Sequence, residues 1–192
     1  MKRYLSVAMA ALLMTSAASA QKVNFGIKGG LNLFTVETDP DMDLKSRTHF
    51  NAGLLAHIHL GPQFALQPEL LYSGQGAESK TAENKQKLGY INVPINFQYM
   101  FDNGFRLQAG PQVGFLVSAE SIVGNVETEV KDQYKTVDFG ITAGLGYVHS
   151  PTGFGVDARY NLGLTDITEN KLNDHKNRGF QIGVFYLFNH KD

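Results

Sequence analysis

Two histidines set two residues apart are the first candidates for chemistry in this sequence. His57 and His59 share one side of an alternating segment, where two imidazoles could supply two ligands to a transition metal. The competing interpretation makes them hydrogen-bonding side chains close to one end of a strand, and we favour it. The sequence therefore predicts neither a metal site nor a cofactor.

A hydrolytic site would require a nucleophile beside a base and an orienting group. Ser46, His49 and Asp43 lie close together in the sequence, and His175 follows Asp174 near the other end of the chain. Proximity in sequence is weak evidence, and neither a nucleophile-elbow sequence nor a pair of catalytic carboxylates stands out. We therefore expect no enzyme, and a lipid-acting enzyme is kept as the alternative.

Six charged residues on the polar side of alternating segments form a balanced set. The set contains three cations and three anions, namely Lys28, Arg106 and Arg159, and Glu69, Asp138 and Asp157. Isolated charges are costly in a low-dielectric interior, so these residues should pair. Counting from the turns places Lys28, Glu69 and Arg159 at one depth and Arg106 and Asp157 nearer the short turns. We expect an ion pair of Glu69 with Lys28 or Arg159.

The composition narrows the classes of protein to be considered. The chain has 192 residues, with 17 Lys and Arg against 18 Asp and Glu, and no cysteine. This length fits one domain. Near-neutral charge without a basic block argues against a nucleic-acid partner, and the lack of cysteine excludes disulfides and thiol chemistry.

The N-terminal residues have the pattern of a signal peptide. Lys2 and Arg3 precede an apolar stretch at 5–14, and Ala18-Ser19-Ala20 fits a cleavage site. An uncleaved anchor is the alternative, but the apolar run is short for a membrane span. We expect a signal peptide at 1–20 and an exported domain at 21–192.

Eight segments after the signal peptide alternate between apolar and polar residues, as strands do when their two faces meet different media. They lie at 23–33, 50–60, 64–72, 91–101, 105–117, 137–147, 154–162 and 180–188. None of the eight apolar faces contains a charged residue. The last segment is less regular, because Phe185 and Leu187 stand on its polar side.

The connections between these segments alternate in length. Tight-turn sequences occur at 61–62, 102–104 and 150–153, and longer polar segments occur at 34–48, 74–87, 118–135 and 164–177. An even number of antiparallel strands with short turns at one end and long loops at the other is typical of an outer-membrane barrel. Both termini would then lie at the short-turn, periplasmic end.

The apolar faces could point outward to lipid or inward to a ligand, as in a soluble lipocalin-like barrel. Glycines decide between these alternatives, because 11 of them stand on the polar side of the segments. Glycine weakens strands and has no use on a water-facing exterior, whereas a narrow lumen requires small residues. The sequence therefore predicts an all-β, eight-stranded antiparallel up-and-down transmembrane β-barrel with short periplasmic turns and long extracellular loops.

Two further features follow from the barrel assignment. Pro68, Pro94 and Pro111 lie inside predicted strands, where we expect local bulges. Aromatic residues near the short turns predict a periplasmic belt without tryptophan; core aromatics of a soluble sandwich are the alternative. The belt comprises Phe64, Tyr99, Phe101, Phe105, Tyr147, Phe154, Tyr186 and Phe188.

Short motifs along most of the chain resemble the PorT-like outer-membrane β-barrel family. They are the opening 25–32 (FGIKGGLN), then 66–73 (LQPELLYS), 90–94 (YINVP), 109–114 (AGPQVG) and 138–140 (DFG). The resemblance implies an architecture like that of small OmpA-type, porin-family barrels. It also implies that prolines at the positions of Pro68, Pro94 and Pro111 are common in the family. The end of the last strand, 185–188, resembles the signal read by the barrel-assembly machinery.

These observations predict an integral outer-membrane protein of a diderm bacterium with a plugged lumen and a structural or surface-interaction role. A narrow solute channel is a further alternative. The expected partners are outer-membrane lipid, the barrel-assembly machinery during biogenesis, and an extracellular or envelope protein. No nucleic acid is expected, and the protein is expected to be a monomer.

Overall fold

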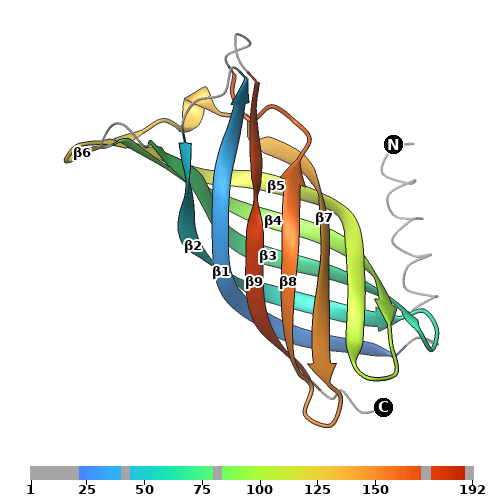
Figure 1. Ribbon diagram of the computed structural model, residues 1–192. Coiled ribbons are helices and arrows are strands. Elements are labelled where there is room, and N and C mark those ends of the chain that lie inside the picture. The colour runs from blue at the N-terminus through green and yellow to red at the C-terminus, as the bar shows by residue number, and fades with distance from the viewer. Residues whose placement is uncertain (1–21, 40–43, 80–83, 170–173, 189–192) are drawn as a thin grey trace, which may run out of the picture.

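The chain folds into a closed antiparallel barrel (Figure 1), which confirms the predicted fold class. The computed structural model describes residues 22–39, 44–79, 84–169 and 174–188, so the predicted signal peptide at 1–20 lies outside the described residues. Within these ranges the elements are β1 (Val23–Asp39), β2 (Leu44–His59), β3 (Phe64–Ser79), β4 (Asn84–Met100), β5 (Phe105–Val123), β6 (Val126–Glu129), the 3-10 helix η1 (Lys131–Gln133), β7 (Val137–His149), β8 (Phe154–Gly163) and β9 (Asp174–Leu187). None of the described helical residues forms a helix that is both long and apolar enough to span a membrane.

Eight of the strands make the ring. Sheet neighbours run in the order β4, β3, β2, β1, β9, β8, β7, β5, and pairing of β4 with β5 closes the circle. Each pair is antiparallel, and β1 meets β9 from Gly26–Leu187 to Asp39–Asp174. Among the described strands, the ninth, β6, pairs only with β5 and lies outside the ring.

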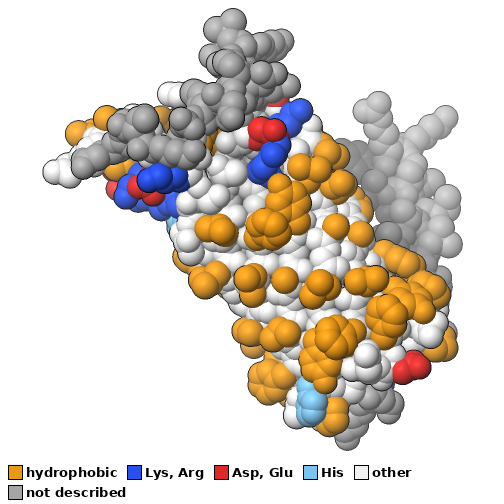
Figure 2. Space-filling view, viewed as in Figure 1, with side chains coloured by type: hydrophobic (Ala, Val, Ile, Leu, Met, Phe, Trp, Pro, Cys, Tyr) orange, Lys and Arg blue, Asp and Glu red, His pale blue; other side chains and the backbone are white. Residues whose placement is uncertain are grey.

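The outside of the barrel is apolar and the inside is polar. Large apolar side chains such as Phe25, Leu54, Leu145 and Ile182 are between half and two-thirds exposed, while asparagines, glutamines and charged residues are buried. Figure 2 shows the apolar side chains gathered around the body of the barrel, with Lys, Arg, Asp and Glu mainly at one end. This arrangement confirms that the apolar faces point outward.

Most strands are longer than a membrane crossing requires. A tilted spanning strand needs about 9–11 residues, whereas β1 to β5 contain 16 to 19 residues each. The expectation that 34–48, 74–87 and 118–135 are loops is therefore only partly right. Backbone pairing between neighbouring strands extends into all three, because hairpins leave few backbone groups unpaired.

The strand extensions form a small sheet, here called the wing, from 44–46, 77–79, 84–88, 119–123 and 126–129. The ladder between β1 and β2 ends at the pair Phe34–Arg47, beyond which β1 stays with β9 and β2 stays with β3. The wing therefore separates from the β1–β9 hairpin and reaches away from the ring, ending at β6 (Figure 1).

The prediction of bulges at the three prolines is wrong. The register on both sides of Pro68, Pro94 and Pro111 is unchanged in every ladder that contains them. Each proline instead lies where one ladder omits a pair while the ladder on its other side continues, so a missing N–H is accommodated without an extra residue. Register shifts occur elsewhere, between Ser46 and Asn51 and between Gly89 and Tyr90.

Inward-facing glycines are required because neighbouring backbones approach closely. A Cβ atom at Gly53 would lie 2.0 Å from the Leu70 carbonyl oxygen, and one at Gly110 would lie 1.9 Å from that of Ile95. The closeness of the neighbouring strand, more than the width of the lumen, therefore explains glycine at these positions.

The glycine contacts give a test with a matched control. Gly53→Ala should lower the free energy of unfolding by about 1–3 kcal/mol, because backbone must move to relieve the clash. Gly29→Ala should change it by less than about 0.5 kcal/mol, since its Cβ would meet only the Asn51 carbonyl oxygen at 3.8 Å. Urea titration in detergent micelles measures both, and equal losses would contradict this explanation.

Candidate functional site

Four charged side chains meet in the middle of the lumen, and we call them the ionic quartet. Lys28 comes from β1, Glu69 from β3, and Asp157 and Arg159 from β8. Their side chains are at most 2% exposed. Lys28 is ion-paired with Asp157 and lies 3.7 Å from Glu69. Arg159 Nη2 lies 2.7 Å from Glu69 Oε2 and 3.2 Å from Asp157 Oδ2.

The quartet crosses the full width of the barrel. In the ring, β2, β1 and β9 separate β3 from β8 on one side, and β4, β5 and β7 separate them on the other. The Arg159–Glu69 contact therefore joins opposite walls. Two cations and two anions balance, as burial in a low-dielectric interior demands.

Amide side chains extend the quartet toward other strands. Gln67 donates a hydrogen bond of 2.8 Å to Glu69 Oε1, and Gln108 of β5 lies 3.5 Å from Asp157 Oδ2. Both amides bond to carboxylate oxygens that also accept from the cations, which adds hydrogen bonds to the buried ion pairs. The quartet and its amides thus connect side chains of β1, β3, β5 and β8 across the lumen.

Of the other two predicted members of the charge network, Arg106 reaches the quartet through Gln98 and Gln108, and Asp138 lies apart from it. Arg106 donates to Gln98 Oε1 at 3.2 Å, and its guanidinium lies 5.6 Å from the centre of the Phe185 ring. Asp138 accepts hydrogen bonds from Thr165 at 2.7 Å and Asn177 at 3.0 Å. Five of the six charges are therefore connected by ion pairs and amide hydrogen bonds, while Asp138 bonds to Thr165 and Asn177 toward the other end of the barrel.

An apolar layer closes each end of the polar lumen, a feature that the sequence reasoning missed. At the short-turn end the layer consists of Leu55, Val148, Phe185 and Leu187. At the other end it consists of Val36, Ala77, Leu88, Tyr90, Leu116, Ala119 and Ile167. The signal was present, because Phe185 and Leu187 break the alternation of the last strand and several members of the second layer continue the inward positions into predicted loops.

Asp166 ties the connections above the second apolar layer together. Its Oδ2 accepts a hydrogen bond of 2.7 Å from Lys135, and its Oδ1 accepts the N–H groups of Thr168 and His175 at 3.2 and 3.0 Å. Burial raises the pKa of Asp166, but these hydrogen bonds outweigh it and hold the pKa well below its ordinary value.

The histidine and nucleophile candidates are only partly brought together. The rings of His57 and His59 meet edge to face, with centroids 4.6 Å apart. Among the described residues, no group of three or more His, Asp or Glu is placed to hold a metal ion. Asp43 lies outside the described residues, and no hydrogen bond joins Ser46 to His49 in the described part of the chain.

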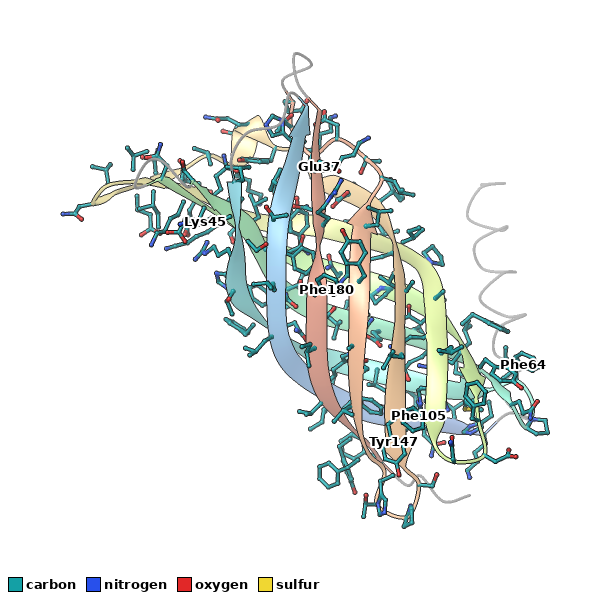
Figure 3. The ribbon with its side chains drawn as sticks, viewed as in Figure 1. Glu37, Lys45, Phe64, Phe105, Tyr147 and Phe180 are labelled. Carbon is teal, nitrogen blue, oxygen red and sulfur yellow. The ribbon has the colours of Figure 1, made fainter. Side chains whose placement is uncertain are left out.

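The predicted aromatic belt forms a set of ring contacts at the short-turn end. Phe64 packs on Tyr99 and Tyr99 on Phe101, with centroids 5.4 and 4.9 Å apart. Three more pairs continue around the barrel: Phe105–Tyr147, Phe154–Tyr186 and Tyr186–Phe188. Figure 3 shows Phe64, Phe105 and Tyr147 toward this end, opposite Glu37 and Lys45.

Removal of one charge from the quartet should destabilise the barrel. Glu69→Gln leaves two buried cations with one carboxylate, so the free energy of unfolding should fall by about 3–5 kcal/mol. The double variant Glu69→Gln/Arg159→Gln restores the balance and should lose less than the sum of the two single losses. Additive losses in urea titrations would show that these residues are not energetically coupled.

Asp166 should stabilise its loop at neutral pH and lose this effect in acid. Its pKa is lowered by folding, so its contribution is complete above the unfolded value near pH 4 and declines below it. Asp166→Asn should therefore speed amide exchange at Thr168 and His175 roughly tenfold at pH 7, measured by hydrogen exchange. Unchanged exchange rates would contradict this role.

Comparison with known proteins supports the barrel from both sequence and structure. Residues 18–169 match the family described as outer membrane protein beta-barrel domain. Neisserial surface protein A (NspA) superposes with a TM-score of 0.60 at 13% identity, covering 87% of this chain and 99% of that one. The attachment invasion locus protein Ail of Yersinia pestis gives 0.53 at 18% identity, with coverage of 87% and 99%. Comparison with curated protein sequences gives no match.

The family match covers more than half of the sequence, and the apolar exterior and closed ring agree with it. The chain therefore belongs to the outer membrane protein beta-barrel domain family and is a protein of the bacterial outer membrane.

Proposed function

We propose that this protein is a plugged outer-membrane barrel that acts through its extracellular surface, in a structural or surface-interaction role. The observation that carries the proposal is the wing. Strands of the barrel continue beyond the apolar band and build an extracellular sheet whose last strand, β6, has a partner on one side only. A rigid sheet held above the membrane is a platform on which a partner can bind.

The wing presents charges of both signs. Lys85 pairs with Glu78 at 3.3 Å, and Lys87 lies 2.5 Å from Glu127 and 3.7 Å from Glu120. One solved structure of Ail contains the heparin analogue sucrose octasulfate. In this chain Lys85 and Lys87 are already paired with glutamates, which favours a protein surface of mixed charge over a polyanion as the partner.

The plugged lumen disfavours the solute-channel alternative. The ionic quartet joins opposite walls, and an apolar layer lies on each side of it. A continuous water path would have to disrupt buried ion pairs and both layers. The lipid-acting enzyme also has less support, because Ser46 and His49 are not hydrogen-bonded to each other in the described residues.

Several finer assignments belong to the same proposal. The chain is assigned to the PorT-like branch of small porin-family barrels, on the motifs at 25–32 and 66–73. Residues 1–20 are assigned as a cleaved signal peptide and 21–192 as the barrel domain. Insertion by the barrel-assembly machinery and a monomeric state complete the assignment.

Electrical recording tests the plugged lumen. Purified protein in planar bilayers should give no large, stable conductance, because the quartet and apolar layers block the lumen at three levels. A porin measured in the same bilayers supplies the positive control. Steady openings of porin size from most inserted molecules would contradict the plug.

Site-specific cross-linking tests the extracellular role. A photoreactive residue at Thr128 of β6 should yield high-mass adducts in intact cells, because this position lies at the open edge of the wing. The same residue at Asn103, in a periplasmic turn, is the matched control. Adducts from Asn103 alone, or from neither position, would count against a surface partner.

A further inference from the structure

The open edge of the wing is strand β6, at the tip of the wing in Figure 1. Among the described strands β6 pairs with β5 alone, and all four of its residues are exposed. Bonds to a neighbouring strand alternate along an antiparallel ladder. The N–H of the next residue, Val130, donates to the Ala119 carbonyl at 2.9 Å. The backbone of Thr128 therefore also points to β5, whereas the N–H and C=O groups of Glu127 and Glu129 point away and can template a further strand.

The face of β6 that carries the two glutamate side chains has an excess of negative charge. Glu129 lies opposite Glu120 of β5 in the ladder, and Lys87 is ion-paired with Glu120 and Glu127. Glu129 forms no ion pair within the described part of the chain. Three carboxylates therefore have one ammonium group in ion-pair contact, which favours a neighbouring strand with basic side chains on this face.

The opposite face of the same hairpin is apolar. Val126 lies opposite Val123, and the two residues are 65% and 57% exposed. Thr128 is on the same face as Val126, because side chains alternate along a strand. A strand that alternates between basic and apolar side chains would therefore meet matching residues on both faces of β6.

A second copy of this chain does not supply such a strand. In an antiparallel pair of two β6 edges, the residues whose backbone groups point outward would bond to one another. Glu127 or Glu129 would then lie opposite a glutamate of the other copy, and like charges directly opposite destabilise a sheet. Charged edge residues commonly protect a sheet against pairing with its own copies. The edge is therefore protected against self-association and open to a strand of opposite charge.

We propose that β6 binds an extended segment of an extracellular protein as a further antiparallel strand, with lysine or arginine at every second position and apolar residues between them. The inference rests on the proposed surface role and adds the chemistry of the partner. The outward backbone groups of Glu127 and Glu129 bond the segment. Its basic side chains lie opposite these two glutamates, and the apolar side chain between them lies beside Thr128 on the other face. The segment is the basic part of the partner's mixed-charge surface.

Fluorescence anisotropy with short labelled peptides tests this inference on the full chain in maltoside micelles. One probe alternates lysine and valine, and the other has glutamate in place of lysine. The lysine probe should bind the wild type about tenfold more tightly. Glu129→Lys should reverse this preference. Glu78→Lys, the same change of charge on β3, is the matched control and should keep it.

N-methylation of the lysine probe separates strand addition from simple attraction of charges. Methyl groups on the lysine amides remove the N–H groups that face β6 and should weaken binding about tenfold. Methyl groups on the valine amides, which face away, should leave binding unchanged. Both measurements use the wild type, so they do not depend on the folding of a variant.

Two results would overturn the inference: equal binding of the lysine and glutamate probes, or equal losses from the two methylations. If Thr128 forms cross-links in cells while the two probes bind equally, the proposed surface role stands and the inference about its partner fails alone. If Thr128 forms no cross-links and neither probe binds, both fail together.

Discussion

The constraint on which this structure depends is that backbone N–H and C=O groups cannot remain unpaired in hydrocarbon. A sheet meets it only by closing on itself, and pairing of β4 with β5 completes the ring here. With eight strands the ring is narrow, so inward positions must be small or must pack against one another. The buried quartet, in which Arg159 and Glu69 meet from opposite walls, is a consequence of this narrow closure.

The interior is organised in layers along the barrel axis. An apolar layer lies at the periplasmic end, the ionic quartet and its amides occupy the middle, and a second apolar layer lies beneath the extracellular connections. Asp166 holds those connections through hydrogen bonds to three partners. The two apolar layers and the ion pairs between them hold side chains of opposite walls together, so the lumen supports the walls of the barrel.

The sequence was informative where a local period determines the structure. Alternation with a period of two identified all eight barrel strands and their outward faces, because lipid and lumen select different residues. Depth counted from the turns did not identify the quartet fully, since strands in a barrel are tilted and staggered. It placed Asp157 away from Lys28, which the structure joins to it. The wing was missed because polar extended strands and loops have similar compositions.

The orientation of the strands can be measured directly, because the chain contains no cysteine and single cysteines can be introduced one at a time. Nitroxide labels at Leu31, Asn32 and Leu33 of β1, in lipid vesicles, would report contact with dissolved oxygen and with a water-soluble nickel chelate. The account predicts that oxygen reaches positions 31 and 33 and that neither reagent reaches position 32. Access of the nickel chelate to position 32 would show an open aqueous lumen and contradict the account.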